Sequence, residues 1–212
     1  MFITFEGLDF CGKSTQLKLL KKYALSKNYQ IEVMREPGGT EISEMVRSIL
    51  LDKKNNAMVM ETEIFLYSSA RAQLVREKIL PYLREGKLVL SDRFHDSTTA
   101  YQGYGRGIPL ESINRINALA IGNAVPDRTY LPIISIDEFI ARKAKAQGHD
   151  RIESLNVDFF EKVLNGYTEI SKNDSRFLVL DGSKSIDEIQ SIIRADFDEY
   201  ILKSNYIKTK AL

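Results

Sequence analysis

One stretch near the start of the chain has the residue types and spacing of a phosphate-binding loop. Residues 7–14 read GLDFCGKS, which fits the pattern G-x-x-x-x-G-K-[ST]. The glycines at positions 7 and 12 let the backbone curl, so that successive N–H groups can point inward and surround phosphate oxygens. A helix is predicted to begin at the end of the loop, and its positive N-terminal end also favours an anion. The motif therefore predicts a site for the triphosphate of ATP or GTP.

Two side chains of this loop, and one further along the chain, could act on the triphosphate directly. Lys13 supplies a mobile positive charge for the β and γ phosphates, and the hydroxyl of Ser14 can coordinate Mg²⁺. The apolar run 88–90 leads into Asp92, and a carboxylate at the end of a strand is the usual second part of such a site. We expect Asp92 to hold Mg²⁺ through water. Considered alone, Asp92 could equally form a loop ion pair with Arg93.

The rest of the chain alternates between two hydrophobic periodicities. Short runs rich in β-branched and aromatic residues predict strands at 2–5, 30–34, 87–90, 129–134 and 177–180. Between them, apolar residues recur at helical spacing over 15–26, 62–84, 110–121, 157–170 and 186–202. This alternation predicts an α/β fold, a five-stranded parallel sheet with helices on both faces. No repeat or linker divides the chain, so we expect a single domain over residues 1–212.

Composition narrows the class of protein. Lys and Arg total 30 against 29 for Asp and Glu, so no net charge attracts nucleic acid or a membrane surface. A single cysteine, Cys11, cannot form an internal disulfide, which fits a reducing compartment. No segment has the roughly 18 uninterrupted apolar residues that a membrane span needs. We therefore expect a soluble cytoplasmic protein with no cleaved leader and no nucleic-acid or membrane partner.

Residues 141–153 are a polar, basic interruption of the pattern. They include Arg142, Lys143, Lys145 and Arg151. Such a composition suits a mobile flap over an anionic ligand, and it suits an ordinary solvated helix end equally well.

Because phosphate loops occur in GTPases, motor ATPases and kinases alike, the loop does not identify the reaction. Three further segments resemble those of the thymidylate kinase family of P-loop nucleoside monophosphate kinases: REPGGT at 35–40, DRFHDSTTAYQG at 92–103 and DRIE at 150–153. The resemblance runs almost from end to end. It implies that the chain transfers the γ-phosphoryl group of ATP to dTMP, giving dTDP and ADP for dTTP synthesis. It also implies a Mg²⁺ cofactor, a short lid at about 141–153 and a homodimer.

The resemblance also assigns residues to the two substrates. For ATP it implies the loop and the first helical residue: Gly7, Leu8, Asp9, Phe10, Cys11, Gly12, Lys13, Ser14 and Thr15. For dTMP it implies Asp9, Arg35, Pro37, Tyr67, Arg71, Arg93, Ser97, Tyr101 and Gln102. In the family an aromatic residue stacks on thymine and an arginine four residues later donates to its O4, and these correspond to Tyr67 and Arg71. For this pair considered alone, ordinary helix packing with a surface arginine is the favoured explanation.

Catalysis of phosphoryl transfer depends on cations that align the substrates and neutralise charge on the moving group. Some family members carry an arginine inside the loop, but positions 8–11 here hold none, so the resemblance implies that the lid provides one. The catalytic candidates are Lys13, Arg93, Arg142, Arg151 and Asp9. Asp9 either positions dTMP or only accepts hydrogen bonds from loop amides.

Three departures from the family's pattern keep other functions open. Phe10 replaces a common glycine, Pro132 interrupts a predicted strand, and the lid has lysines where relatives are richer in arginine. The alternatives are another P-loop nucleotide kinase and a non-catalytic nucleotide-binding protein.

Overall fold

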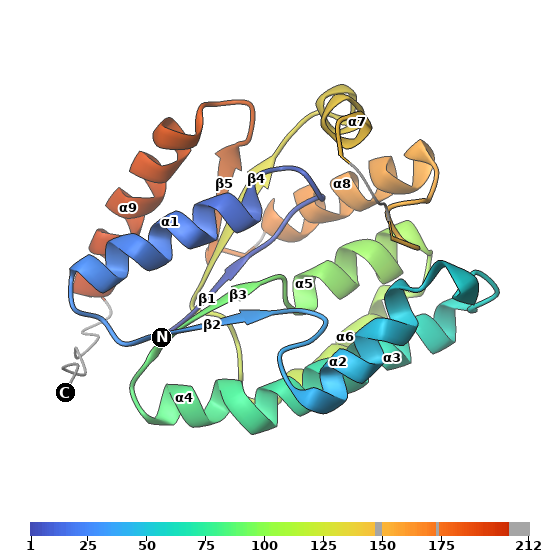
Figure 1. Cartoon of the computed structure of the whole chain (residues 1–212), viewed down its shortest axis with the longest axis horizontal. Helices are drawn as coiled ribbons and strands as arrows, with labels where there is room; N and C mark the ends of the chain where they lie inside the picture. Colours follow the sequence, from blue (N-terminus) through green and yellow to red (C-terminus); the bar gives the residue numbers. More distant parts are fainter. Residues whose placement is uncertain (147–149, 173, 204–212) are drawn as a thin grey trace.

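The sheet predicted from the sequence is present. The structure, a computed structural model, describes residues 1–146, 150–172 and 174–203. Its strands are β1 (Phe2–Phe5), β2 (Ile31–Arg35), β3 (Leu88–Asp92), β4 (Arg128–Ile133) and β5 (Phe177–Asp181). They form one parallel sheet in the order β2-β3-β1-β4-β5 (Figure 1). The α/β fold is therefore confirmed, with strand bounds within two residues of those predicted.

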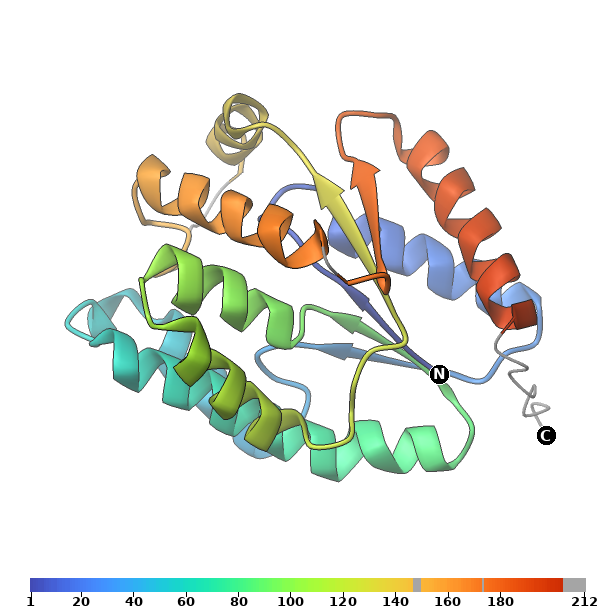
Figure 2. The same cartoon turned by 180° about the vertical axis from the view of Figure 1, so that it is seen from behind.

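Helices cover both faces of the sheet because side chains of each strand alternate between the faces. On one face, α1 (Lys13–Ser26) and α9 (Ile186–Lys203) pack against Ile3 and Phe5 of β1. Figure 1 shows these two helices lying side by side. Figure 2, from behind, shows the opposite face covered by helices that include α5 (His95–Thr98), α6 (Leu110–Ile121) and α8 (Val157–Lys172). The core is thus split into two apolar layers with the sheet between them.

The predicted helix at 62–84 is not one regular helix. It consists of α3 (Met60–Leu74), a π-helical segment (Val75–Ile79) and α4 (Leu80–Arg84). Pro81 stands in the first turn of α4. Because proline has no N–H for the carbonyl four residues earlier, the regular hydrogen-bond ladder is interrupted at this point.

Several helical segments were missed by the sequence analysis. They are α2 (Glu41–Leu51), a 3₁₀ turn (Lys53–Asn55), α5 with the π-helical segment that follows it (Thr99–Gly105), and α7 (Ile136–Ala144). Thr40 and Ser135 cap α2 and α7, accepting hydrogen bonds from the amides of Ser43 (3.1 Å) and Glu138 (3.2 Å). These caps were the available local signals.

The segment 141–153 begins as the end of a helix, because α7 extends to Ala144. Of the predicted lid, residues 147–149 lie outside the described residues. Within the described part of the chain, no helix is both long and apolar enough to cross a membrane.

Pro132 is accommodated in β4 without loss of a hydrogen bond to β5. The amide of Thr129 donates to Arg176, beside β5, so the N–H groups of residues 130 and 132 face the β1 side. On that side the paired residues of β1 end at Phe5, opposite Tyr130, and the amide of Glu6 donates to the Tyr130 carbonyl (2.9 Å). Pro132 therefore lies just beyond the paired part of β1, at the end of the ladder, where a missing N–H disturbs a sheet least.

Candidate active site

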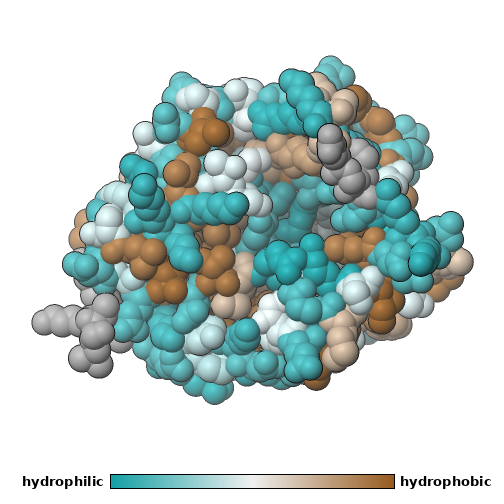
Figure 3. All heavy atoms as spheres, in the orientation of Figure 1, coloured by the Kyte–Doolittle hydropathy of each residue, from teal (hydrophilic) through white to brown (hydrophobic). Residues whose placement is uncertain are grey.

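A charged cavity of about 510 Å³ opens at the carboxyl ends of β1, β2 and β3. Its walls come from the phosphate loop, residues 35–37, α2, α3, the segment after β3 and residues 150–153. Figure 3 shows a hollow lined by hydrophilic residues near the centre of the face of the molecule that it draws. The register pairs both Phe5 and Arg35 with Asp92, so the chain segments that leave these three strands start side by side. This edge of a parallel sheet is where open α/β folds bind ligands.

The phosphate loop is curled by residues with positive φ. Gly7 has φ 130° and Gly12 has φ 99°. A Cβ on Gly7 would lie 2.8 Å from the carbonyl oxygen of Pro132, so only glycine fits there. Phe10 also has a left-handed backbone, with φ 63°, and its ring packs on Phe139 at 6.0 Å between centroids. Glycine adopts this conformation without strain, whereas a phenylalanine here carries a conformational cost.

Lys13 lies at the centre of the loop. Its Nζ donates to the carbonyl oxygens of Gly7 (3.0 Å) and Leu8 (2.6 Å). The side chains of Leu8 and Cys11 instead point into the apolar core, each at most 2% exposed. If they contact a nucleotide, they must do so through the backbone.

The two predicted metal ligands lie next to each other. The Ser14 hydroxyl donates to Oδ2 of Asp92 over 2.5 Å, although 78 residues separate them in sequence. Among the described residues no cluster of three or more His, Cys, Asp or Glu side chains could hold a metal. One hydroxyl and one carboxylate nevertheless fit Mg²⁺, which keeps several waters and shares substrate phosphates.

Arg93 joins the phosphate loop to the opposite wall of the cavity. Its Nη1 donates to the carbonyl oxygen of Gly7 (3.0 Å), to Ser97 Oγ (3.1 Å) and to the hydroxyl of Tyr167 (3.2 Å). Its Nη2 forms an ion pair with Asp9. Burial opposes the charged form of Asp9, but the charges of Arg93 and Lys13 outweigh burial and lower its pKa. Asp9 is therefore ionised at neutral pH.

Arg71 borders the same cavity, 2% exposed. Nε donates to Oε2 of Glu36 (2.7 Å), Nη1 to Thr98 (2.8 Å) and Asn117 (3.4 Å), and Nη2 to the carbonyl of Phe94 (3.1 Å). Nη2 also lies 2.6 Å from Glu36 Oε2. An arginine has five N–H donors, so each has a protein partner here.

Most residues predicted for the two substrates line this one cavity: Asp9, Phe10, Gly12, Lys13, Ser14, Thr15, Arg35, Pro37, Tyr67, Arg71, Asp92, Arg93, Ser97, Tyr101 and Gln102. Tyr101 donates to Asp9 (3.2 Å) and Gln102 to Glu63 (3.0 Å). Burial, followed by the charges of Glu63 and Asp150, raises the pKa of Tyr67, so its hydroxyl stays protonated.

The two lid arginines do not line the cavity. Arg142 donates to the carbonyl oxygens of Phe10 (3.0 Å) and Gly182 (2.9 Å), beside the phosphate loop. Arg151 is on the other side, where Nε donates to the carbonyl of Leu50 (2.7 Å) and Nη2 lies 2.6 Å from Glu63 Oε2. To reach a phosphoryl group in the cavity, either side chain must leave these partners.

Several residues of the site were missed from the sequence. Arg47, on the unpredicted α2, lines the cavity and donates to the carbonyl of Pro37 (2.8 Å). Glu6, Glu36 and Glu63 are buried partners of the polar network around the cavity. Of the four, only Arg47 had a sequence signal, because it follows the Thr40 cap within an amphipathic helix.

A phosphate loop between β1 and α1, a serine–aspartate pair beside it and a second charged wall across one cavity define a P-loop nucleotide kinase. Comparison with known proteins narrows this class. The thymidylate kinase family model matches residues 5–193. The chain belongs to the thymidylate kinase family.

Individual relatives agree over nearly their whole length. The thymidylate kinase of Thermoanaerobacter sp. (strain X514) is 47% identical over 193 residues, covering 91% of this chain and 94% of the relative. That of Kosmotoga olearia is 41% identical over 198 residues, 93% of this chain and 95% of the relative. That of Thermosipho africanus is 43% identical over 202 residues, 95% of this chain and 99% of the relative.

Proposed function

We propose that this chain transfers the γ-phosphoryl group of ATP to dTMP, forming dTDP and ADP. Family membership supports this reaction. The observation that carries it is that one cavity has Lys13 and the Ser14–Asp92 pair on one wall and Tyr67 and Arg93 on the other. Two anionic substrates bound there would meet with their phosphates between cations. In-line transfer requires this alignment and little covalent participation by the protein.

The wall that carries Lys13 and the Ser14–Asp92 pair, the donor wall, binds ATP. Loop amides and the positive end of α1 surround the phosphates, and Lys13 moves from its carbonyl partners to the β and γ phosphates. Ser14 and Asp92 hold Mg²⁺, which neutralises charge on the phosphates when bound.

The wall that carries Tyr67, Arg71 and Arg93, the acceptor wall, binds dTMP. Arg93 takes the acceptor phosphate, and Tyr67 stacks on the base. Both Nη atoms of Arg93 already donate to protein acceptors, so Arg93 either uses Nε or exchanges one of these partners for the phosphate. Arg71 has no unused donor, so to reach O4 of thymine it must exchange a partner. The 3.4 Å contact of its Nη1 with Asn117 is the longest of its hydrogen bonds and the easiest to exchange. Either Arg142 or Arg151 supplies the lid cation after leaving its partners described above.

A panel of acceptors tests the reaction. ADP release is measured with ATP, Mg²⁺ and each of dTMP, dUMP, dCMP, AMP and GMP. We expect the highest kcat/KM with dTMP, and faster turnover of a purine nucleotide would refute the proposal. Calorimetry separates a non-catalytic binder from an enzyme, because such a protein would bind ATP and dTMP without forming product.

We propose that the chain works as a homodimer. The helices α2, α3 and α6 lie next to one another and form one side of the molecule (Figure 1). They expose the large apolar side chains Ile42, Met45, Ile49, Phe65 and Leu119, of which Phe65 is 59% and Leu119 78% exposed. A second copy that presents the same face would remove this apolar surface from water.

Light scattering on the purified protein tests the dimer. We expect the mass of two chains, and the mass of one for Phe65→Glu. Leu202→Glu is the matched control, because Leu202, like Phe65, is an exposed apolar side chain (78% exposed) but lies on α9. A monomeric wild type, or a dimer that survives Phe65→Glu unchanged, would count against this face. We place the enzyme in the cytoplasm, where the single free thiol, Cys11, stays reduced.

A further inference from the structure

The residue immediately before the phosphate loop, Glu6, is a fully buried carboxylate outside the predicted site. Oε1 accepts a hydrogen bond from the amide of Phe94 (2.7 Å). Oε2 accepts from Ser97 Oγ (2.6 Å) and from the hydroxyl of Tyr167 (3.0 Å). Glu6 thus connects the end of β1 with the start of α5 and with α8. A buried carboxylate carries a large desolvation cost, which the hydrogen bonds to both of its oxygens offset here.

The role of Glu6 depends on the direction of its hydrogen bonds. Each hydroxyl has a single proton, and an ionised Glu6 can accept those of both Ser97 and Tyr167, whose oxygens also lie 2.9 Å from each other. Their lone pairs are then left to accept from Nη1 of Arg93, at 3.1 and 3.2 Å. An acceptor-only group at Glu6 therefore makes both hydroxyls acceptors toward the arginine, and this holds the guanidinium between Gly7 and Asp9.

We propose that Glu6 is a positioning residue for the acceptor phosphate: by accepting from Ser97 and Tyr167, it turns both hydroxyl oxygens toward Arg93 and holds that cation beside the phosphate loop. The inference rests on the proposed function only in that Arg93 takes the phosphate of dTMP. Glu6 itself does not touch a substrate. If position 6 donated a hydrogen bond instead, the hydroxyl that accepts it could no longer donate to that oxygen. Its proton would turn toward the other hydroxyl or toward Arg93, and the guanidinium would lose part of its acceptor set.

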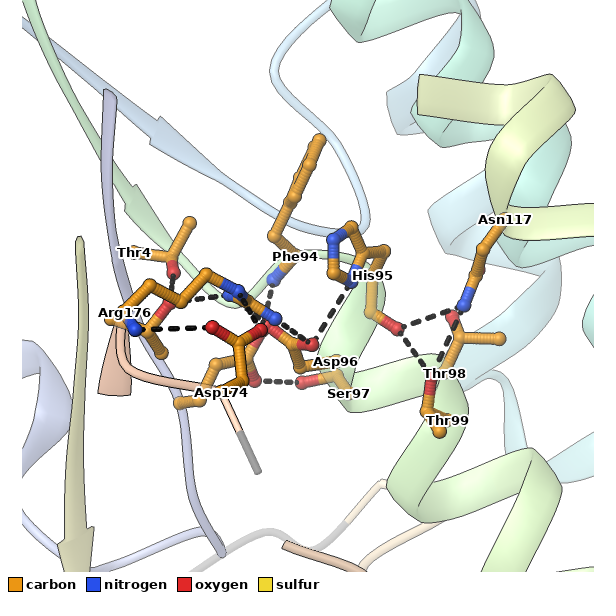
Figure 4. Close-up of polar contacts among 12 residues, drawn as sticks. Thr4, Phe94, His95, Asp96, Ser97, Thr98, Thr99, Asn117, Asp174 and Arg176 are labelled. Atoms are coloured by element: carbon orange, nitrogen blue, oxygen red, sulfur yellow. Dashed lines mark hydrogen bonds and ion pairs between the residues drawn. The ribbon is translucent and has the colours of Figure 1, made fainter. Parts of the chain in front are cut away.

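The surroundings of Glu6 make this arrangement sensitive to pH. Charged or titratable groups face it from the segment after β3 (Arg93), from α5 (Asp96) and from α8 (Tyr167). Figure 4 shows Asp96 next to both Arg176 and His95. The nitrogen–oxygen distances are 2.6 Å to Arg176 and 3.0 Å to His95. Burial and then the Asp96 charge raise the pKa of Glu6 to about 7, against the opposing effects of Ser97 and Arg93.

The direction of this pH dependence follows from which carboxylate oxygen of Glu6 takes the proton. Oε1 must remain an acceptor for the Phe94 amide, so a proton binds at Oε2 and points toward the two hydroxyls. Arg93 is therefore held correctly when Glu6 is ionised, above about pH 7, and loses its support as the pH falls through 7.

Steady-state kinetics of Glu6→Gln test the proposal, with dTMP and ATP varied separately between about pH 6 and pH 9. We expect KM for dTMP to rise about tenfold, as for loss of one charge-assisted contact, while KM for ATP changes less than about twofold. In the wild type, kcat/KM for dTMP should fall below about pH 7; in the variant this extra fall disappears. The dTMP phosphate titrates near pH 6 in both proteins, so the difference between the two profiles is the readout.

Two control variants separate positioning from folding. Thr129→Val removes buried hydrogen bonds to Thr4 (2.8 Å) and Arg176 (2.6 Å) in the same cluster, neither of which involves Glu6 or Arg93. It should lower Tm and leave KM for dTMP unchanged. Asp96→Asn removes the negative charge that raises the pKa of Glu6, so the acid limb of the wild-type profile should move to lower pH.

The outcomes distinguish this inference from the proposed function. A wild type inactive on dTMP refutes the function. An active wild type with an unaltered KM and pH profile in a folded Glu6→Gln overturns the inference alone. If Glu6→Gln does not fold, Asp96→Asn decides: an acid limb that stays in place rejects the role of Glu6, and a shift to lower pH supports it.

Discussion

The two walls of the cavity are built in different ways. On the donor wall, Lys13 bonds to carbonyls only five and six residues away, within one loop, and the loop reaches a distant segment through the Ser14–Asp92 hydrogen bond, which spans 78 residues. On the acceptor wall, Arg71 bonds to Glu36 across 35 residues, and Gln102 to Glu63 across 39. In the proposed reaction the donor wall receives a triphosphate, whose shape does not vary, and backbone amides suffice for that. The acceptor wall must fit one base, and it is held by buried side chains from distant parts of the chain.

This difference predicts which property each wall controls. Buried ion pairs such as Arg71–Glu36 are strongly destabilised when one partner is lost, because the other charge remains without compensation. Substitutions on the donor wall should therefore affect turnover and leave the fold nearly unchanged. Substitutions on the acceptor wall should affect acceptor use, stability or both.

The largest effect is expected for Lys13→Ala. Loss of its charge from the transferring phosphates should lower kcat by about 10² to 10³, the range found when one preorganised stabilising group is removed. Lys18→Ala, an exposed lysine of the same helix, is the matched control and should retain full activity. The measurement is coupled ADP release, with Tm recorded for both variants. An unchanged kcat in Lys13→Ala would remove the lysine from the mechanism.

Arg93→Lys should have the next largest effect. Lysine keeps the charge but lacks the planar fork that reaches Gly7, Asp9 and the two hydroxyls together. We expect kcat/KM for dTMP to fall by about 100-fold, mostly through KM, while KM for ATP stays within about twofold. Arg115→Lys, in a pair whose arginine is 80% exposed, is the control. Equal losses for both substrates would contradict the division of the cavity into two walls.

The same division sets what the sequence could predict. The donor wall follows from eight consecutive residues, and even Asp92 could be placed because it ends an apolar strand. The sheet followed from the alternation of strand and helix periodicities. Glu36 and Glu63 could not be found, because nothing local distinguishes a buried glutamate that pairs with a distant arginine from a solvated one.

The lid was the hardest part to predict. Composition marked residues 141–153 as basic, but it could not tell that Arg142 contacts the phosphate loop while Arg151 pairs with Glu63. Those contacts depend on how α7 and residues 150–153 pack on opposite sides of the cavity. The missed α2 is a different case: the sequence carries its local signals, the Thr40 cap and an amphipathic pattern over residues 41–51, and what could not be predicted is that Ile42, Met45 and Ile49 stay exposed.

Glu36→Gln disrupts the buried Arg71–Glu36 ion pair, and its cost can be compared with that of disrupting an exposed pair. Glutamine keeps an acceptor for Arg71 but leaves its charge uncompensated, so we expect a loss of about 2 kcal/mol in the free energy of unfolding. For a chain of this length that corresponds to about 4 to 8 °C in Tm. Glu44→Gln alters the Arg35–Glu44 pair, whose side chains are 49% and 44% exposed, and should cost less than about 1 kcal/mol. Calorimetric unfolding of both variants measures the difference, and equal losses would mean that burial of the pair is unimportant.

The smallest effect concerns the base itself. dUMP lacks only the 5-methyl group, whose burial contributes about 0.8 kcal/mol, so kcat/KM should favour dTMP over dUMP by about fourfold. dCMP differs in a polar group, and an arginine donor facing its amino group should cost about 1 to 3 kcal/mol, or roughly 5- to 150-fold. Competition between each pair of acceptors measures both ratios directly. In Lys13→Ala the dTMP to dUMP ratio should remain about fourfold, because the donor wall does not contact the base. A ratio that changes in that variant would show that base recognition and phosphate binding are not divided between the two walls.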